Sequence, residues 1–124
     1  MSDRILIIDD EEHIRRMMRL TLEAAGYEVG EASDGEEGLR LYGDGSTWNA
    51  VVLDQRMPGI DGLETLRRLK KQTPNARVVM ATADVQASTR ELALERGAIA
   101  FVTKPLVADV VLQAVSAALE GAAP

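Results

Sequence analysis

The sequence predicts an α/β protein in which a parallel five-stranded sheet is covered by helices on both faces. Short apolar, β-branched runs alternate along the chain with longer segments whose apolar residues recur at helical spacing. Parallel strands need long crossover connections, and a helix after each strand supplies them. Crossovers on both sides leave both faces of the sheet covered. With 124 residues, of which 46% are hydrophobic, the chain is long enough for one domain with its own core.

The order of the elements follows from these two kinds of segment. The predicted strands are Ile5–Ile8, Tyr27–Glu31, Ala50–Leu53, Arg77–Met80 and Ile99–Val102. The predicted helices are Glu11–Ala25, Gly35–Tyr42, Gly62–Lys71, Val85–Arg96 and Leu106–Leu119. Two helices begin with an aspartate followed three residues later by a glutamate, Asp34 with Glu37 and Asp61 with Glu64, which is a capping pattern. A glycine follows the first and the fourth helices, where a helix C-terminus favours it.

The composition excludes several classes of function. A net charge of −6 argues against a general binder of nucleic acid or of anionic membranes. Without cysteine, the chain has no disulfides, thiolate zinc sites or cysteine nucleophiles. No apolar run approaches the roughly 20 residues that span a bilayer, and we expect a cytoplasmic location with no membrane partner. We expect one domain over residues 1–120, and at 121–124 a tail or the start of a linker.

Chemically distinctive side chains follow four of the predicted strands. Asp9 and Asp10 come directly after the first strand, and Asp54 directly after the third. Thr82 follows the fourth strand and Lys104 the fifth. In open α/β sheets, ligands bind outside the carboxyl ends of the strands. We therefore expect three carboxylates, a hydroxyl and an ammonium to converge at one edge of the sheet.

Three ionised aspartates in one crevice need more positive charge than one lysine supplies. Two unit charges about 4 Å apart interact by about 4 kcal/mol at an effective dielectric constant near 20. A divalent cation would bring three carboxylates and one ammonium to neutrality. Mg²⁺ is the usual choice where a few carboxylates, waters and a phosphate oxygen complete an octahedron. The sequence therefore predicts Mg²⁺ as the cofactor.

A hard cation beside a carboxylate, a hydroxyl and an ammonium indicates phosphoryl transfer. In that chemistry the protein chiefly positions the reactants and neutralises charge on the phosphoryl oxygens. Asp54 is the predicted nucleophile, because a carboxylate can form a covalent aspartyl phosphate. Thr82 and Lys104 would hold two phosphoryl oxygens, while Asp10 and Asp54 hold the metal ion.

Four stretches carry these residues: ILIIDDEEHIRR, VVLDQRMPGIDGLE, VVMATAD and AFVTKPL. In this order and at these separations they resemble the receiver domain of two-component response regulators, over residues 3–120. The resemblance implies a flavodoxin-like sandwich with strand order 2-1-3-4-5. It implies that a sensor histidine kinase or phosphotransfer protein supplies the phosphoryl group from a phosphohistidine. The domain would then change conformation to control an output domain or effector, which the sequence does not identify. Such a domain signals, and catalyses only its own phosphorylation and dephosphorylation.

The resemblance also assigns roles to individual residues. Asp54 matches the phosphoacceptor, Asp10 the direct metal ligand, and Asp9 the acid that holds a metal-bound water. The backbone carbonyl of Arg56 completes the protein ligands of the metal. The remaining matches are Thr82 as switch hydroxyl, Lys104 as phosphoryl-binding lysine, Phe101 as aromatic rotamer switch, and Lys104–Pro105 as a cis peptide bond.

Arg56 and Asp84 lie two residues after Asp54 and Thr82, at positions that border the phosphoryl group in this family. An ion pair between them would hinder the attacking water, so we expect slow self-dephosphorylation.

The last helix has an apolar arc wider than one core face needs. Leu112 and Leu119 are expected near the edge of its buried face, either as a harmless margin or as a surface for a partner or a homodimer.

Other interpretations fit parts of the pattern. Taken alone, Asp9 and Asp10 could cap the first helix. A phosphohydrolase with an aspartyl-phosphate intermediate, of the haloacid dehalogenase type, would carry an acid where this chain has Arg56. A flavin or nucleotide binder would need a Gly/Ser/Thr phosphate loop after the first strand, where the aspartates stand. A receiver-like domain that takes no phosphate would lack one of the five site residues, and none is missing.

Overall fold

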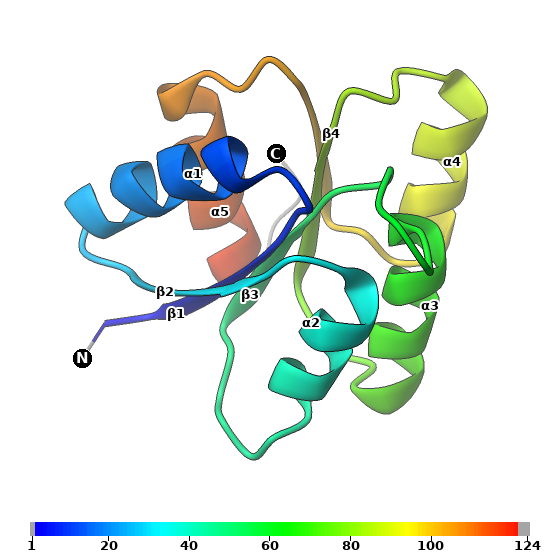
Figure 1. Ribbon diagram of the computed structural model, residues 1–124, viewed down its shortest axis with the longest axis horizontal. Helices are drawn as coiled ribbons and strands as arrows, with labels where there is room; N and C mark the ends of the chain where they lie inside the picture. Colours follow the sequence, from blue (N-terminus) through cyan, green and yellow to red (C-terminus); the bar gives the residue numbers. More distant parts are fainter. Residues whose placement is uncertain (1, 122–124) are drawn as a thin grey trace.

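The computed structural model describes residues 2–121 and alternates strands with helices from end to end (Figure 1). The elements are β1 (Arg4–Ile8), α1 (Glu12–Ala24), β2 (Glu28–Ala32), α2 (Gly35–Tyr42), β3 (Ala50–Leu53), α3 (Gly62–Gln72), β4 (Val78–Thr82), α4 (Ala87–Glu95), β5 (Ala100–Thr103) and α5 (Ala108–Leu119). The strands form one sheet in the order β2-β1-β3-β4-β5, and every neighbouring pair is parallel. The predicted fold class and strand order are confirmed.

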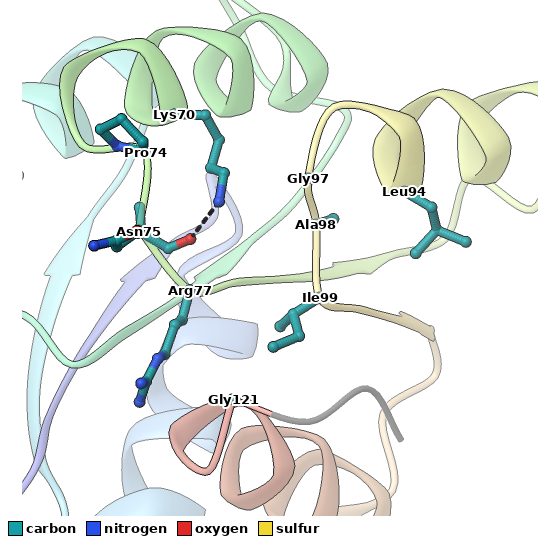
Figure 2. Close-up of a pocket in the computed structure, with 10 residues that line it drawn as sticks. Lys70, Pro74, Asn75, Arg77, Leu94, Gly97, Ala98, Ile99 and Gly121 are labelled. Atoms are coloured by element: carbon teal, nitrogen blue, oxygen red, sulfur yellow. Dashed lines mark hydrogen bonds between the residues drawn. The ribbon is translucent and has the colours of Figure 1, made fainter.

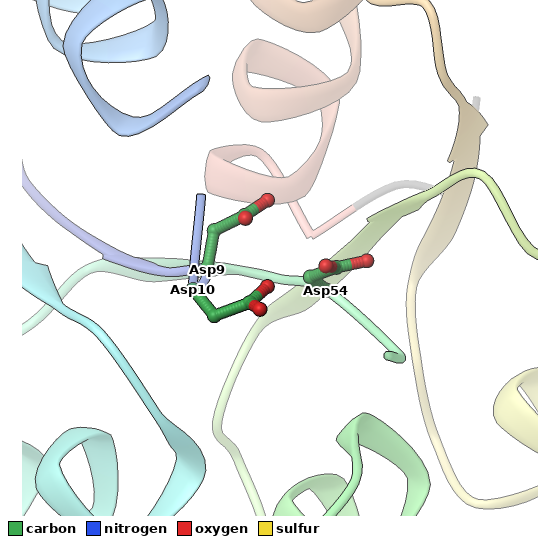
Figure 3. A group of neighbouring side chains, drawn as sticks. All are labelled: Asp9, Asp10 and Asp54. Atoms are coloured by element: carbon green, nitrogen blue, oxygen red, sulfur yellow. The ribbon is translucent and has the colours of Figure 1, made fainter. Parts of the chain in front are cut away.

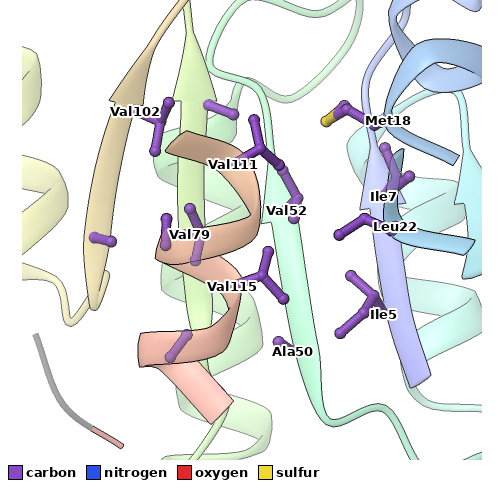
Figure 4. Close-up of a cluster of buried hydrophobic side chains, with 14 residues drawn as sticks. Ile5, Ile7, Met18, Leu22, Ala50, Val52, Val79, Val102, Val111 and Val115 are labelled. Carbon is purple, nitrogen blue, oxygen red and sulfur yellow. The ribbon is translucent and has the colours of Figure 1, made fainter. Parts of the chain in front are cut away.

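Two hydrophobic clusters, one on each face of the sheet, form the core. In the interior strand β1, Ile5 and Ile7 pack toward α1 and α5, whereas Leu6 and Ile8 pack toward α2, α3 and α4. All four side chains are fully buried. Figure 4 shows the first cluster, in which residues of α1 and α5 meet the sheet. A strand buried on both faces has a continuous apolar sequence. Burial of each such Ile or Leu side chain contributes about 1.5–3 kcal/mol to the stability of the fold.

The helix ends follow the capping pattern in the sequence. The Asp34 side chain accepts a hydrogen bond from the Glu37 backbone N–H at 2.8 Å, and Asp61 accepts one from Glu64 at 2.9 Å. The glycines after α1 and α4 have positive φ angles of 95° and 100°. These local signals make α2 match its predicted range and place the start of α3 correctly.

The predicted end of the fourth strand and start of the fourth helix are wrong, because strand pairing and a turn set these boundaries. The strand β4 runs on to Thr82, because this residue pairs with Thr103 of β5 beyond the apolar run. The helix α4 begins at Ala87 rather than Val85. The Asp84 carboxylate accepts the Gln86 backbone N–H at 3.1 Å, and this turn delays the first helical residue.

Most of the tail expected after the domain is not described by the structure. Of the tail expected at residues 121–124, residues 122–124 lie outside the described residues. Within residues 2–121, every helix is too short or too polar to cross a membrane.

Candidate functional site

Three carboxylates meet at the carboxyl edge of the sheet. Asp9 and Asp10 follow β1, Asp54 follows β3, and one oxygen of each lies within 4.8 Å of the others (Figure 3). The strand register explains this convergence, since Ile8 pairs with Leu53 and the Asp54 backbone N–H donates to the Ile8 carbonyl at 3.0 Å. The two strands therefore end at the same level. Asp9 and Asp54 are buried, with exposed fractions of 1% and 4%, whereas Asp10 is exposed.

Lys104 brings the ammonium group into this cluster from the end of β5. Its Nζ atom lies 2.8 Å from Asp9 Oδ2, 3.4 Å from Asp54 Oδ2 and 3.5 Å from Glu11 Oε2. The lysine side chain is only 9% exposed. The predicted convergence of lysine and acids is therefore present in the structure, and Glu11 is an additional acid that the sequence reading did not include.

The pKa values of Asp9 and Lys104 reflect the crowding. Burial raises the pKa of the Asp9 carboxyl, although hydrogen bonds from Lys104 and from the Glu11 backbone oppose the rise. Burial alone would lower the pKa of Lys104, but its hydrogen bond to Asp9 and the charges of Asp9, Asp54 and Glu11 together raise it. Lys104 therefore stays charged at neutral pH, and added positive charge near Asp9 would oppose the rise in its pKa.

Thr82 and Asp84 form the neighbouring wall of the site. Thr82 is fully buried at the end of β4, and its Oγ1 accepts the Asp84 backbone N–H at 3.1 Å. The Asp84 carboxylate also accepts the Thr89 hydroxyl of α4 at 3.3 Å, so the wall is tied to that helix. The Arg56 side chain is 70% exposed and places Nε 3.7 Å from Asp84 Oδ2. The ion pair expected between Arg56 and Asp84 is therefore present.

Several of these side chains line one pocket of about 420 Å³. It brings together Asp10, Asp54, Arg56, Thr82, Lys104 and Pro105 from the ends of β1, β3, β4 and β5. The residues fit a hard divalent cation, because three carboxylates face one ammonium and carboxylate oxygens are the ligands that Mg²⁺ prefers. Buried Asp9 and Asp54 leave an excess of negative charge that such an ion would neutralise.

Phe101 lies on β5, and Pro105 follows shortly after this strand. Phe101 on β5 is partly buried and packs against the core cluster that faces α2, α3 and α4. The Lys104–Pro105 peptide bond is cis, as the resemblance implies.

Gln55 supports the site, and the sequence reading missed it. Its backbone N–H donates to Asp54 Oδ1 at 2.8 Å, and its side chain accepts the Leu63 N–H at 2.7 Å and donates to Asp61 at 3.1 Å. The side chain thus ties the loop after β3 to the start of α3. No periodicity or motif marks such a residue, because its partners come together only when the loop folds back.

The Asp9 carboxylate also closes a turn just before α1. Its Oδ1 accepts the Glu11 backbone N–H at 2.9 Å, just before α1. The N-cap of α1 is Glu11, and it makes no side-chain capping bond, so the aspartates do not act as the helix cap itself. His13 is exposed on the first turn of α1.

Two apolar side chains at the start of the last helix, the N-cap Val107 and Val110, are exposed to solvent. Leu112 and Leu119 are partly buried against the core, as expected for the margin of the buried face. Val107 and Val110 are the more open, with exposed fractions of 59% and 46%. Self-association through this helix stays a prediction.

A second hollow, of about 640 Å³, lies at the opposite end of the sheet, near the start of β4 and β5 (Figure 2). Its cationic side chains are both bonded to the chain itself: Lys70 to the Ala76 carbonyl at 3.0 Å and Arg77 to the Leu119 carbonyl. This hollow has no acid among its lining residues, and the acidic edge is the better candidate site.

Comparison with known proteins identifies the family. Residues 5–116 match the model of the response regulator receiver domain. The chain is 40% identical over 115 residues to the uncharacterized transcriptional regulatory protein YkoG of Bacillus subtilis, covering 93% of this chain and 50% of that protein. The chain spans about half the length of the curated relatives it matches.

Solved structures agree in fold. A CheY-like response regulator receiver domain protein from Methanospirillum hungatei superimposes with a TM-score of 0.91 at 29% identity, covering 98% of this chain and 96% of that chain. NtrX from Brucella abortus, in complex with ADP, gives a TM-score of 0.90 at 35% identity, covering 98% of this chain and 28% of that chain. Together with the acidic edge, these matches show that the chain belongs to the response regulator receiver domain family of two-component systems.

Proposed function

We propose that the protein is a phosphoacceptor switch, in which Asp54 takes a phosphoryl group from the phosphohistidine of a sensor histidine kinase or phosphotransfer protein. The observation that carries the proposal is the cluster of Asp9, Asp10 and Asp54, whose oxygens lie within 4.8 Å, with Lys104 among them. Family membership supports the same reading.

The transfer needs a nucleophile and compensation of negative charge. An oxygen of Asp54 attacks phosphorus, the bond from phosphorus to the histidine nitrogen breaks, and the nitrogen keeps the electron pair. Lys104, 3.4 Å from Asp54, is placed to pair with an incoming phosphoryl oxygen. Asp10, Asp54 and the Arg56 backbone carbonyl would hold Mg²⁺ directly and Asp9 would hold it through water. The ion would supply charge that neutralises the phosphoryl oxygens.

The switch would follow from a new acceptor for the proton of the Thr82 hydroxyl. In the structure its oxygen accepts the Asp84 N–H. A phosphoryl group on Asp54 offers a charged acceptor for this hydroxyl, and charge-assisted hydrogen bonds are about twice as strong as neutral ones. Thr82 would turn toward it, the loop to α4 would shift, and Phe101 would follow. This is a shift of population between two states.

The output of the switch lies in a further domain or a separate effector. YkoG and the NtrX chain are longer than this chain, whereas the Methanospirillum chain in its crystal structure is nearly the same length. We propose that this domain signals without turning over a separate substrate or contacting nucleic acid, and that it acts in the cytoplasm. Val107 and Val110 beside Leu112 would favour self-association through α5.

A binding probe tests the proposal without a partner kinase. Beryllofluoride mimics a phosphoryl group on a carboxylate, and its bound form can be followed by fluorine NMR. We expect bound signals with wild type only when Mg²⁺ is present, and their loss in Asp54→Asn and Lys104→Met. Equal binding in wild type and Asp54→Asn would refute Asp54 as the acceptor.

A further inference from the structure

Arg15 on α1 links the acidic site to the edge of the sheet. Its NH1 donates to the Asp9 backbone carbonyl at 2.7 Å, and its Nε donates to Glu31 Oε1 of β2 at 3.1 Å. The side chain is 16% exposed. We propose that Arg15, clamped by Glu31, is a positioning residue that orients the Asp9–Asp10 peptide so that Asp10 can bind Mg²⁺. This inference rests on the proposed function.

Asp9 is held at every polar atom. Its backbone N–H donates to the Ala32 carbonyl at 3.1 Å, and its two carboxylate oxygens meet the Glu11 N–H and the Lys104 ammonium. The carbonyl is the remaining group, and Arg15 takes it. Contacts with the β2 end, with the start of α1, with Arg15 and with Lys104 therefore hold Asp9 in place.

Asp10 depends on this arrangement more than its neighbours do. It is exposed, and the three acids paired with Lys104 are Asp9, Glu11 and Asp54. The Asp9 carbonyl and the Asp10 N–H belong to one planar peptide group, so holding the carbonyl oxygen sets the direction in which Asp10 leaves the backbone. Groups behind metal ligands commonly set the ligand orientation in this way.

Glu31 fixes the arginine itself. The carboxylate accepts from Arg15 through one oxygen and from Arg19, one helical turn later, through the other. The planar guanidinium can bond Glu31 through Nε and still reach Asp9 through NH1. Arg19 bonds Glu31 and Glu23 but makes no bond to Asp9, so it is a matched control within the same network.

The direction in which Mg²⁺ affinity changes when Arg15 is removed distinguishes a positioning role from a purely electrostatic one. A guanidinium near the site repels Mg²⁺, so on electrostatic grounds alone its removal would tighten Mg²⁺ binding. Loss of positioning has the opposite effect. We expect Arg15→Met to weaken Mg²⁺ binding by about tenfold, the lower end of what loss of an outer-shell partner costs.

The test is titration of the protein with MgCl₂, followed by amide NMR, with urea unfolding of each variant alongside. We expect Arg19→Met to keep the wild-type Mg²⁺ affinity within about twofold while losing stability as Arg15→Met does. Glu31→Ala should weaken Mg²⁺ binding in wild type and add nothing in Arg15→Met, because both changes release the same contact. Autophosphorylation of Arg15→Met by acetyl phosphate should approach the wild-type rate at saturating Mg²⁺.

Two results would overturn the inference. If Arg15→Met binds Mg²⁺ as well as Arg19→Met or wild type does, Arg15 is structural only, and the proposed function is unaffected. If wild type itself shows no Mg²⁺ binding at the acidic edge, both the inference and the proposed function are wrong.

Discussion

At the scale of single residues, the site depends on positions that directly follow the strands. Asp9, Asp54 and Lys104 could be predicted because each lies at the end of an apolar strand segment, and parallel strands end at one edge. Gln55 and Arg15 could not be predicted, because their partners, Leu63 at the start of α3 and Glu31 of β2, belong to other elements. A polar residue whose hydrogen-bond partners come close only in the folded chain leaves no pattern in the sequence.

Arg56 is the residue whose removal should change the lifetime of the phosphorylated state. It lines the pocket, is 70% exposed and pairs with Asp84 at 3.7 Å. An exposed ion pair is worth up to about 1 kcal/mol, so we expect Arg56→Ala to speed dephosphorylation by up to about fivefold. The decay of protein phosphorylated by acetyl phosphate, after removal of the donor, measures this rate. Arg90→Ala, an exposed arginine on α4, is the control. Slower decay in Arg56→Ala than in wild type would contradict the shielding role.

At the scale of the elements, helix starts were predictable where a side chain caps them. The starts of α2 and α3 match because Asp34 and Asp61 cap them. The start of α4 was not predictable, because Asp84 bonds Gln86 and Thr89 in a turn that an apolar pattern does not reveal. The local sequence therefore predicts helix boundaries least well next to the loops that carry site residues.

Gly62 sets the approach of α3 to the phosphoacceptor. A Cβ atom there would lie 2.2 Å from the Asp54 carbonyl oxygen and 2.7 Å from the Gln55 Cα atom, and neither backbone atom can move away cheaply. We expect Gly62→Ala to lower the free energy of unfolding by about 1–3 kcal/mol. Gly43→Ala is the control, because its Cβ would meet the flexible end of Gln72. Urea unfolding measures both variants, and equal stability of the two would show that the close approach is unimportant.

At the scale of the whole molecule, alternation of strand and helix was enough to predict the fold class. The strand order required the family resemblance, because alternation alone is compatible with more than one order. The hydrophobic runs also placed the core, since residues of β1 and β3 are buried on both faces of the sheet. Three of the 20 acidic residues, Asp9, Asp10 and Asp54, gather at one edge of the sheet.

This distribution makes stability depend on pH and Mg²⁺ together. The pKa of Asp9 in the folded protein is raised above its usual 3.8. Protonated Asp9 therefore contributes stability at low pH, and that contribution is lost as the pH rises through the folded pKa. Mg²⁺ binds the ionised carboxylates, so we expect it to stabilise the protein at pH 7 and much less near pH 4. A concentration about 100 times the dissociation constant adds about 2.7 kcal/mol.

Calorimetric unfolding with and without MgCl₂ at the two pH values measures this coupling. Asp10→Asn is the control, because it removes a predicted ligand that makes no ion pair with Lys104. Its unfolding temperature should respond little to Mg²⁺ at pH 7. An equal response of wild type and Asp10→Asn would place the Mg²⁺ effect elsewhere on the molecule.

The most direct measurement is intact mass after incubation with acetyl phosphate, with and without Mg²⁺, on wild type, Asp54→Asn and Asp61→Asn. Asp61 lies at the other end of the same loop, and asparagine caps α3 as well as aspartate does. We predict one added phosphoryl group on wild type and on Asp61→Asn, dependent on Mg²⁺, and none on Asp54→Asn. Absence of the adduct on wild type, or its persistence in Asp54→Asn, would contradict a Mg²⁺-dependent phosphoacceptor at Asp54.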